Sequence, residues 1–398
     1  MHNFNLLQNC VVTNKNVILR VDINVPIVGG IIQDDTRIRA IIPTLKYLIK
    51  NQAKVILISH FGRPKGKKVL EMSLGQLVGR VEELLGQRIK FIDDCIGDKV
   101  ALEVQKANYG EVILLENLRF YPQENNNDLV FSQSLASLGN LYVNDAFSCS
   151  HRSHSSIVGV AKILKNCAGL LLARELDNLQ NLLHNPRKPM MAIVGGSKVS
   201  SKIDLLNALI TKADAIFIAG GMANTFLYAK GNNVGKSLCE KDLGSLALEI
   251  LTNAKGHNCE IILPNDVVVC KKLENGVDTK NVNLGDVQED DIIADVGEQT
   301  IKDLKNRIDN FKTIIWNGPL GAFEVKPFDK STNDLAIIIA RKTREQKLVS
   351  VAGGGDIISA LNSSGFINDF SYISTAGGAF LEWLEGKNLP GIEVLLNN

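Results

Sequence analysis

The chain has 398 residues, with 44 Lys and Arg against 43 Asp and Glu. This length favours two domains, and the charge balance argues against a nucleic-acid-binding protein, which would carry a basic excess. We expect no membrane span, because no apolar run approaches the roughly 20 residues that a membrane helix needs.

The charge is unevenly distributed along the chain. Residues 1–170 hold 20 basic and 15 acidic side chains, and residues 171–398 hold 24 and 28. The basic first part favours an anionic ligand, although ordinary surface charge explains the count equally well. The 7 cysteines contain no CxxC pair, and the N-terminus lacks a signal-peptide pattern. We therefore expect a reducing, cytoplasmic location.

Short β-branched runs alternate with amphipathic stretches in the first part of the chain. The runs predict strands at Val17–Val21, Lys54–Ser59, Glu111–Leu115 and Leu141–Asn144. The stretches between them predict helices at Thr36–Lys50, Ser73–Leu85 and Leu129–Leu138. Such alternation is typical of a parallel sheet covered by helices.

The same alternation returns after a helix predicted at Ala173–Leu183, which is followed by a stiff connector at His184–Pro189. Strands are predicted at Met190–Val194, Ala215–Ala219, Glu260–Pro264, Lys312–Trp316 and Lys347–Ala352, and helices at Lys202–Lys212, Gln299–Asn310 and Asn333–Thr343. We predict an α/β protein of two doubly wound, Rossmann-like parallel-sheet domains joined by that helix.

Polar and cationic residues follow the predicted strands of the first part. In open α/β sheets, ligands bind beyond the carboxyl ends of the strands. Arginine side chains bind carboxylate and phosphate oxygens with two parallel hydrogen bonds. The pattern therefore predicts an anion pocket among the strand-end residues Asp22, Asn24, His60, Arg63, Arg119, Asn144, Asp145, His151, Arg152 and His154, with Arg37 at the start of the first helix.

Glycines follow the predicted strands of the second part. They stand at Gly195–Gly196, Gly220–Gly221, Gly318, Gly353–Gly355 and Gly377–Gly378. Glycine lets backbone N–H groups approach a phosphate, and tight strand-to-helix turns would normally need only one. The repeated pairs predict a nucleotide site. Lys198 and Lys202, four residues apart at a predicted helix start, are expected to face the same phosphate.

Two familiar phosphate-binding motifs are missing. The chain has no GxGxxG, which weakens a dinucleotide-dependent oxidoreductase as the alternative enzyme class. Gly231–Ser237 imitates a P-loop but has three residues between its glycines instead of four, so we interpret it as a turn. A non-enzymatic, two-lobed anion-binding protein is the second alternative.

Taken together, the motifs resemble phosphoglycerate kinase over almost the full length of the chain. Glycine motifs alone are weak, but their order and spacing here are highly specific. The segments that carry the resemblance are RVDINVP (20–26), SHFGRP (59–64), LLENLRF (114–120), NDAFSCSHRSHSS (144–156), AIVGGSKVSSKI (192–203), WNGPLGAFE (316–324), VAGGGD (351–356) and STAGGAFLEWLEG (374–386).

This resemblance implies a kinase that moves a phosphoryl group between 1,3-bisphosphoglycerate and ADP, with Mg²⁺, giving 3-phosphoglycerate and ATP. A monomer without nucleic-acid or membrane partners is expected. Residues 1–170 plus the tail 387–398 would bind the triose acid, and residues 171–386 the nucleotide. The tail Leu389–Asn398 would return to the first domain.

The resemblance also assigns roles to single residues. The acid site would comprise Asp22, Asn24, Arg37, His60, Arg63, Arg119 and Arg152, with Asp22 binding a hydroxyl group. In the nucleotide site, Glu324 would hold the ribose and Asp356 the Mg²⁺. Catalysis would involve Arg37, Lys198, Gly377 and Gly378; nucleotide binding would involve Lys198, Lys202, Gly220, Gly221, Asn317, Glu324, Gly354, Gly355, Asp356 and Ile357.

Four positions depart from the family pattern. Ile23 replaces a phenylalanine, and Ser148–Ser150 replaces a Gly-Thr-Ala type run. Ile357 stands where a hydroxyl residue is usual, and Ala376 replaces the first glycine of a triplet. The last two positions bear on nucleotide affinity and on rate.

Overall fold

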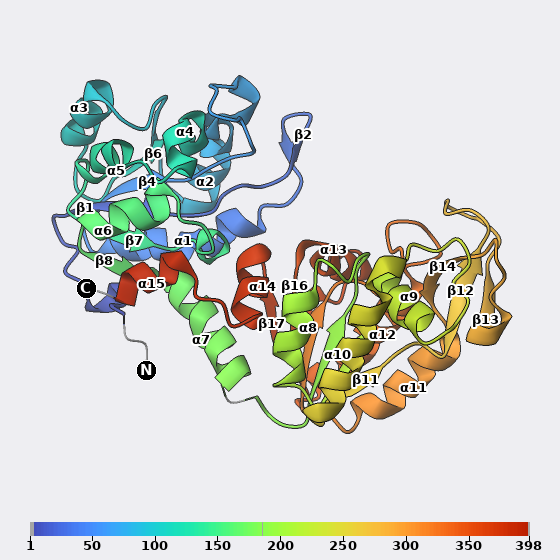
Figure 1. Cartoon of the computed structure of the whole chain (residues 1–398). Coiled ribbons are helices and arrows are strands. Elements are labelled where there is room, and N and C mark those ends of the chain that lie inside the picture. The colour runs from blue at the N-terminus through green and yellow to red at the C-terminus, as the bar shows by residue number, and fades with distance from the viewer. Residues whose placement is uncertain (1–3, 185, 397–398) are drawn as a thin grey trace. The chain divides into compact units, whose positions relative to one another are not determined.

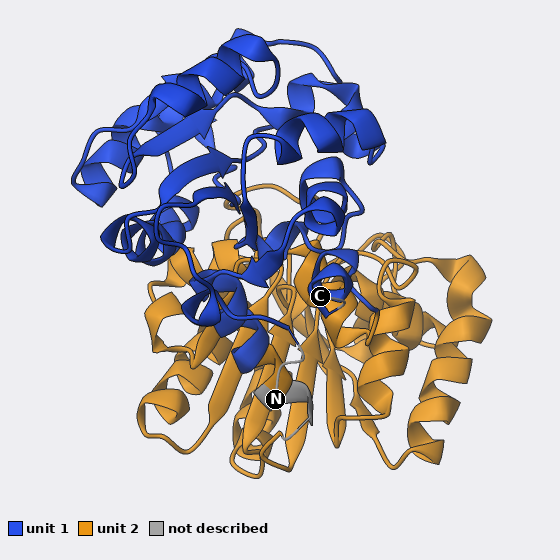
Figure 2. Cartoon of the chain, turned by 90° about the vertical axis from the view of Figure 1, so that its left-hand side faces the viewer, with its two compact units in different colours: residues 1–178, 388–398 blue, residues 179–387 orange. Residues whose placement is uncertain are grey.

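The structure of the chain is a computed structural model that describes residues 4–184 and 186–396. It divides into a first unit, residues 1–178 with 388–398, and a second unit, residues 179–387 (Figures 1 and 2). The division falls inside helix α7 (Leu170–His184), which our prediction had placed wholly in the second domain. Among the described residues, no helix is both long enough and apolar enough to cross a membrane.

The first unit is built on a sheet that, over the described residues, has six strands in the order β5-β6-β4-β1-β7-β8, with all neighbours parallel. The strands are β1 (Asn16–Arg20), β4 (Lys54–Ile58), β5 (Lys90–Ile92), β6 (Val112–Leu115), β7 (Leu141–Asn144) and β8 (Asn166–Ala168). The helices are α1 (Thr36–Lys50), α2 (Val78–Leu85), α3 (Asp98–Lys106), α4 (Pro122–Asn125), α5 (Leu129–Ala136), α6 (Val160–Ile163) and α15 (Pro390–Leu396). A short hairpin, β2 (Ile27–Val28) and β3 (Ile31–Ile32), projects beside them.

Helix α1 shows why these elements pack. Its residues Ile38, Ile41, Leu45 and Leu48 recur at intervals of three or four and are fully buried. They share one hydrophobic cluster with Val17, Val55 and Val112 of the sheet. Each such side chain contributes about 1.5–3 kcal/mol by leaving water. This burial fixes the start of the helix, and therefore Arg37, against the sheet.

The second unit has a second parallel sheet. Over the described residues it has six strands in the order β11-β10-β9-β15-β16-β17. The strands are β9 (Met190–Val194), β10 (Ala215–Ile218), β11 (Glu260–Ile262), β15 (Thr313–Asn317), β16 (Val349–Gly353) and β17 (Tyr372–Ser374). The helices are α8 (Ile203–Ile210), α9 (Gly220–Ala229), α10 (Gly244–Gly256), α11 (Glu298–Ile308), α12 (Lys330–Arg344), α13 (Gly355–Ser364) and α14 (Gly378–Leu384). The two sheets confirm the predicted fold class.

The second unit also contains an antiparallel sheet that the sequence interpretation missed. It consists of β12 (Asp266–Cys270), β13 (Lys280–Asn283) and β14 (Ile292–Val296), in the order β13-β12-β14. Both sides of this small sheet pack on apolar side chains, one in a cluster around Val267 and Val269 and the other in a cluster with Cys270, Ala294 and Phe328. Its strand pairings join segments that are separated by loops, so the sequence of any one segment does not predict them.

Two predicted helices are shorter than expected. The segment Ser73–Leu85 begins as a 3₁₀ turn, Leu74–Leu77, and becomes α-helical only at Val78. Its two glycines, Gly75 and Gly79, disfavour a continuous helix. Helix α8 begins at Ile203, so Lys198 lies in the preceding turn rather than on the helix.

The C-terminal helix α15 packs against the first unit, as the resemblance implied. The backbone N–H of Gly391 donates to the carbonyl of Ser150 at 2.8 Å. The side-chain amides of Asn144 and Asn166 donate to the carbonyls of Gly391 (3.1 Å) and Val394 (3.3 Å). A side chain at position 391 would collide with Ser150, so glycine is required there. The last two residues of the predicted tail lie outside the described residues.

Two buried carboxyl groups lie at the start of α7. Asp145 Oδ1 accepts hydrogen bonds from the backbone N–H groups of Leu171 (2.8 Å) and Leu172 (3.0 Å), which caps the helix. Glu175, one turn further, is buried, and its Oε2 has no hydrogen-bond partner among the described residues. The pKa of Glu175 is raised to about 8, mainly by burial; the charge of Arg174 opposes the rise and that of Asp145 adds to it.

We expect Glu175→Gln to stabilise the protein at alkaline pH. The pKa of Glu175 is higher in the folded than in the unfolded chain, so its stabilising contribution is complete below the unfolded pKa and is lost as pH rises through about 8. The free energy of unfolding of the wild type should therefore be lower than that of the glutamine variant by on the order of a few kcal/mol at pH 9. The two free energies should be equal near pH 4. Urea unfolding at both pH values measures this, and a constant difference would contradict the assignment.

Candidate active sites

The predicted anion-binding residues lie at one edge of the first sheet. Strands β6, β4, β1 and β7 are adjacent and parallel, so their carboxyl ends meet there. The loops that follow these four strands carry Arg119, His60 with Arg63, Asp22 with Asn24, and Arg152, respectively. The sheet order therefore brings together residues up to 130 positions apart in sequence.

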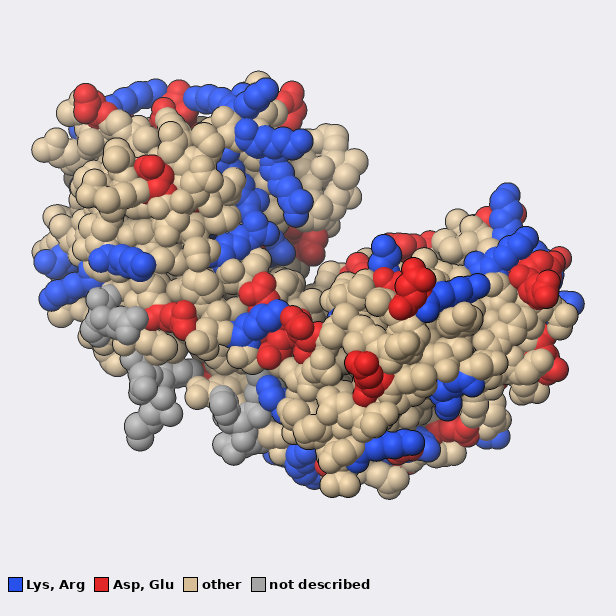
Figure 3. Space-filling model, viewed as in Figure 1, with Lys and Arg blue, Asp and Glu red and all other residues tan. Residues whose placement is uncertain are grey.

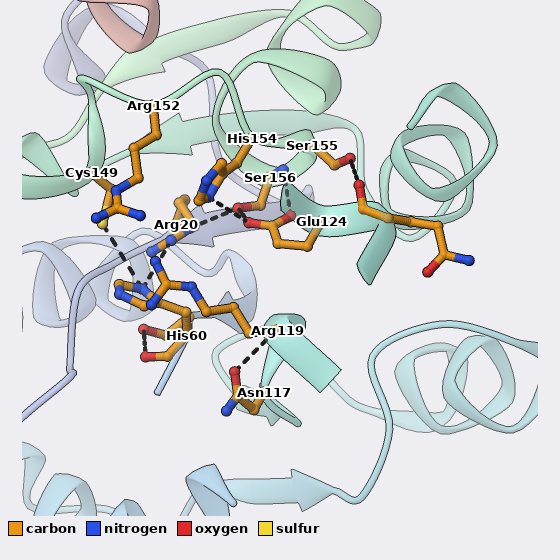
Figure 4. A network of polar contacts seen from close by, with 12 residues as sticks. Arg20, His60, Asn117, Arg119, Glu124, Cys149, Arg152, His154, Ser155 and Ser156 are labelled. Atoms are coloured by element: carbon orange, nitrogen blue, oxygen red, sulfur yellow. Dashed lines mark hydrogen bonds and ion pairs between the residues drawn. The ribbon is translucent and has the colours of Figure 1, made fainter. Parts of the chain in front are cut away.

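Three arginines and one histidine form what we call the cation cluster: Arg20, His60, Arg119 and Arg152. Their side chains point toward one another (Figure 4). Arg20 is 1% exposed and donates to His60 Nδ1 at 3.2 Å. Burial lowers the pKa of Arg119, and the charges of Arg152 and Arg20 lower it further. Positive charge concentrated in this way is stabilised by a bound anion.

Acidic side chains are sparse around this edge of the sheet. Figure 3 shows a band of Lys and Arg side chains along one side of the first unit, with few acidic ones within it. Glu124, a buried carboxylate, accepts hydrogen bonds from the Oγ of Ser156 (2.6 Å) and from the backbone N–H of Ser156 (3.0 Å). These hydrogen bonds use part of the accepting capacity of the Glu124 carboxylate. The cation cluster therefore keeps a net positive charge.

Asp22 connects the cluster with helix α1. Its carboxylate accepts from Arg37 Nη1 at 2.9 Å and from Ser148 Oγ at 2.5 Å. Burial alone would raise the pKa of Asp22, but His60, Arg37 and the hydrogen bonds from Ser148 and Asn24 lower it to about 2. Burial also lowers the pKa of His60 well below its usual value, and the charge of Asp22 opposes this. Arg37 forms an ion pair with Asp22.

Asn24 fixes the neighbouring loops. Arg37 Nη1 donates to the Asn24 carbonyl at 3.1 Å, and Asn24 Oδ1 accepts from the backbone N–H of Gly62 at 2.9 Å. Arg119 Nη1 in turn donates to the Gly62 carbonyl at 2.8 Å. Arg63 follows directly and is exposed. Six predicted residues therefore converge, and Arg63 lies at the outer rim of the same loop.

Asp22, His60 and Cys149 offer ligand atoms within 4.8 Å of one another, the kind of group that can hold a metal ion. The chemistry of the surroundings disfavours a cation. Arg20 donates to His60 Nδ1, and Arg37 and Ser148 occupy the same Asp22 oxygen. We therefore assign this group to the anion site.

We expect Ser148→Ala to weaken binding at the anion site, because the Ser148 hydroxyl helps to orient Asp22. A hydrogen bond to a charged group of this kind contributes about 1 kcal/mol or more, which corresponds to roughly a fivefold rise in the KM for the anionic substrate predicted to bind here. Ser148→Thr, which keeps the hydroxyl, should restore the KM. Equal KM values for alanine, threonine and wild-type enzymes would show that Ser148 has no positioning role.

The glycine-rich turns of the second unit also meet at one edge. They follow β10, β9, β15, β16 and β17, which are adjacent in the sheet. Gly220 has φ +68°, and a side chain there would lie 2.7 Å from the Gly196 carbonyl. A side chain at Gly195 would overlap the carbonyl of Pro319. These glycines are therefore required for the turns to pack backbone against backbone.

Lys202 and Asn317 contact each other at this edge. Lys202 Nζ donates to Asn317 Oδ1, and Asn317 Nδ2 donates to the Gly353 carbonyl at 2.5 Å. Burial lowers the pKa of Lys202 to about 8, while the charges of Asp356 and Glu385 partly oppose this. A lysine that has lost part of its hydration is stabilised in its charged form by an anionic ligand such as a phosphate.

A cavity of about 350 Å³ opens beside these turns. Its walls combine apolar residues with glycines and three carboxyl groups, the exposed Glu324 and Asp356 and the buried Asp295. The other lining residues include Gly196, Gly220, Gly221, Leu227, Leu238, Val267, Ile293 and Leu320. A planar apolar group such as a nucleobase fits walls of this kind, with polar groups at the rim.

The remaining predicted residues take different positions. Lys198 is exposed in the turn after β9, whereas Ile357 is fully buried in the second hydrophobic cluster. Any contact of Ile357 with a ligand would therefore use its backbone. Ala376 is also buried, and Gly377 and Gly378 form the turn into α14, with Gly377 at φ +55°. Gly354, at φ +113°, lies directly against Asn317 Nδ2.

Comparisons with known proteins agree with this description. The sequence profile of the family described as phosphoglycerate kinase matches residues 7–387. Phosphoglycerate kinase of Caulobacter vibrioides (strain NA1000 / CB15N) is 50% identical over 392 residues, which cover 98% of this chain and 99% of that protein. Phosphoglycerate kinase of Chelativorans sp. (strain BNC1) is 51% identical over 384 residues, 96% of each chain.

Solved structures give the same result. The structure of phosphoglycerate kinase from Coxiella burnetii has a TM-score of 0.89 at 39% identity and covers 98% of both chains. That from Pyrococcus horikoshii OT3 has a TM-score of 0.85 at 30% identity, covering 99% of this chain and 98% of the other.

Two parallel-sheet units, one with a cationic edge and one with a glycine-lined edge, define a two-domain α/β kinase. With the matches above, the chain belongs to the phosphoglycerate kinase family. It is therefore an enzyme of the transferase class that acts on phosphoglycerate and on the nucleotide pair ATP and ADP.

Sequence reasoning missed several residues of these sites. Arg20 belongs to the motif RVDINVP, but the sequence did not suggest it as a site residue, because the last position of a buried strand normally holds an apolar residue. The signal was its charge inside an otherwise apolar run. The cavity walls Val267 and Ile293 come from the overlooked antiparallel sheet. The available signal was the continuous β-branched run Val267–Val269.

Proposed function

We propose that the chain catalyses the glycolytic, reversible transfer of a phosphoryl group from 1,3-bisphosphoglycerate to ADP, with Mg²⁺, as a cytoplasmic monomer. The observation that carries the proposal is the cation cluster in the first unit together with the glycine-lined cavity in the second. One site has the charge to bind an acid phosphate, and the other has the shape and backbone donors for a nucleotide.

In the first unit, the arginines would neutralise the carboxylate and phosphate of the triose acid, and Asp22 would accept a hydrogen bond from its hydroxyl. Asp22 is suited to accepting because its pKa of about 2 keeps it ionised. In the direction of ATP consumption, the attacking group is the substrate carboxylate, whose pKa is roughly 4, so it is already ionised. No general base is required, and Asp22 need not act as one.

In the second unit, Lys202 and Lys198 would contact phosphates, and Glu324 would hold the ribose at the rim of the cavity. Asp356 would hold Mg²⁺. A single exposed carboxylate suits this ion, which commonly takes one or two protein carboxylates together with phosphate oxygens and water. Mg²⁺ would neutralise charge on the phosphate oxygens during transfer.

A coupled assay tests the proposal directly. The purified chain should consume ATP only when 3-phosphoglycerate and Mg²⁺ are both present, and EDTA should abolish turnover. Asp356→Asn should need more Mg²⁺ for half-maximal rate. Magnesium-independent turnover, or no turnover with any nucleotide, would reject the proposed reaction.

We also propose that the two units approach each other during the reaction, with the hinge in the segments that connect them. The proposed sites lie on different units, and in-line transfer needs the reacting atoms within roughly 3–3.5 Å. Closure would also exclude water from the transferring group. Solution scattering should show that 3-phosphoglycerate and a magnesium nucleotide together reduce the radius of gyration more than either ligand alone. An unchanged radius with both ligands bound would refute the hinge.

A further inference from the structure

We propose that Asn117 is a positioning residue of the acid site, which fixes His60 and Arg119 relative to each other. Asn117 lies between β6 and the 3₁₀ turn Leu118–Phe120, in the loop that carries Arg119. The inference rests on the proposed function, since it assumes that the first unit binds the triose acid. It concerns how the loops of that site are held, and in this role Asn117 does not contact the substrate.

The side-chain amide of Asn117 is buried, and each of its hydrogen-bonding positions is used. The residue is 1% exposed. Its Nδ2 donates to the carbonyls of Phe61 (2.7 Å) and Met72 (2.8 Å). Its Oδ1 accepts from the backbone N–H groups of Phe61 (3.1 Å) and Arg119 (3.0 Å). An asparagine amide has two donor hydrogens and an oxygen that accepts two hydrogen bonds, so it matches this position. Aspartate and leucine, which have a similar size, lack the donors.

The bonds to Phe61 continue the connection between two strands beyond the end of their ladder. The strands β4 and β6 are parallel neighbours, and their last paired residues are Leu57 and Leu114. Past this pair, the Asn117 side chain bonds both backbone groups of Phe61, as the backbone of a neighbouring strand does within a sheet. The loops that follow β4 and β6 are therefore tied together at this point.

This tie acts directly on two members of the cation cluster. Phe61 follows His60 in the chain, and its side chain is buried in the hydrophobic cluster of the first unit. Asn117 bonds the backbones of Phe61 and Arg119, and a dashed line in Figure 4 marks the bond to Arg119. The Arg119 guanidinium then donates to the Gly62 carbonyl at 2.8 Å. Loss of the amide would therefore release Arg119 and the loop of His60 from each other.

The fourth hydrogen bond joins a third segment of the chain to the same amide. Asn117 donates to the carbonyl of Met72, whose sulfur would lie 3.0 Å from a side chain at Gly62. The neighbouring Glu116, also buried, accepts from Ser73 Oγ at 2.6 Å. These bonds hold Met72 against the loop that follows β4. Three segments therefore converge on one side-chain amide.

A role confined to the local turn is the alternative. Asn117 is the N-cap of the turn Leu118–Phe120, where its Oδ1 accepts from the Arg119 N–H. Serine is also a good N-cap, but its side chain is shorter and has a single donor hydrogen. A serine here therefore cannot bond Phe61 and Met72 together. Asn117→Ser keeps the cap and removes the tie between the loops, so it separates the two roles.

The test measures ligand binding to the full-length chain by isothermal titration calorimetry. In Asn117→Ser, the dissociation constant of 3-phosphoglycerate should rise by about tenfold, since the hydrogen bonds to Phe61 and Met72 are lost. The dissociation constant of magnesium ADP should stay unchanged, because the proposed nucleotide cavity lies in the second unit. Asn117→Leu, which keeps the size of the side chain and also loses the cap, should weaken 3-phosphoglycerate binding at least as much.

Asn166→Ala is the matched control. Asn166 is another buried asparagine of the first unit, and its amide donates to the carbonyls of Ala161 (2.8 Å) and Val394 (3.3 Å). It begins β8, at the amino end of a parallel strand, whereas the acid site lies at the carboxyl ends. This variant should lower the melting temperature and leave both dissociation constants unchanged.

Amide hydrogen exchange, resolved by NMR, provides a readout without any ligand. The Phe61 N–H should lose protection in Asn117→Ser, whereas the Arg119 N–H should keep it. A normal dissociation constant for 3-phosphoglycerate in Asn117→Ser, equal losses of affinity for both ligands, or unchanged protection of the Phe61 N–H would each overturn the positioning role. A wild-type chain that binds no 3-phosphoglycerate would reject the proposed function, and the inference with it.

Discussion

Replacing Arg37 by alanine should reduce turnover by about 10³-fold or more while the chain stays folded. Arg37 lies at the start of α1, where contacts with the Asp22 carboxylate and the Asn24 carbonyl hold its guanidinium. We propose that this group neutralises charge that develops on the transferring phosphoryl group. Arginines with that role in other phosphoryl-transfer enzymes contribute 10³–10⁵-fold. Steady-state kinetics in both directions measures the loss.

Arg39 provides a matched control on the same helix. It is exposed and pairs with Asp35 at 2.8 Å, an ion pair of the kind that contributes little to stability. Arg39→Ala should keep nearly normal turnover and a nearly normal melting temperature. If Arg37→Ala also turned over at a near-normal rate, Arg37 would have no part in stabilising the transition state.

Alanine replacements at Lys198 and Lys202 should have different kinetic effects. Lys198 is exposed in the turn after Gly195 and Gly196, so its side chain can follow the phosphoryl group during transfer. Lys202 is held by Asn317 and close to Asp356. We expect Lys198→Ala mainly to lower kcat, by about 10²-fold, and Lys202→Ala mainly to raise the nucleotide KM. The opposite pattern would reverse the two assignments.

The nucleotide KM should also depend on pH through Lys202. Its pKa of about 8 means that the unliganded enzyme loses this charge as pH rises through 8, so the nucleotide KM should increase there. The Lys202→Ala enzyme should lack that increase. Lys255→Ala, at an exposed position of α10, serves as a control that should retain the wild-type KM and its pH dependence.

The elements that were predicted best are those whose burial pattern is local. The bounds of α1, β7 and β9 match the prediction, because each is a continuous apolar run or a regular apolar stripe. The loops that follow the strands could be named as sites because parallel strands place their carboxyl ends together. The sequence order of strands does not give their order in the sheet, however, and the sheet order is what gathers the loops that carry Arg119, His60, Asp22 and Arg152 at one edge.

Other features depended on contacts that no local pattern encodes. The antiparallel pairing of β12 with β13 and β14 joins separate segments, so it was missed. The lowered pKa of Lys202 arises from the burial of this residue just before α8. Arg20 is held by a hydrogen bond to the hydroxyl of Ser156, which lies 136 positions further along the chain. Ile357 was expected at the nucleotide, yet its side chain completes the core of the second unit.

Because helix α15 packs against the first unit, that unit is assembled from two separate parts of the chain. Residues 388–398 are synthesised after the second unit, which is complete once residue 387 has emerged. During synthesis, the second unit therefore has all its parts first, and the first unit waits for the contacts that Gly391 and Val394 make with Ser150 and Asn166. Premature termination near residue 387 would release a polypeptide with an intact second unit and an unfinished first one.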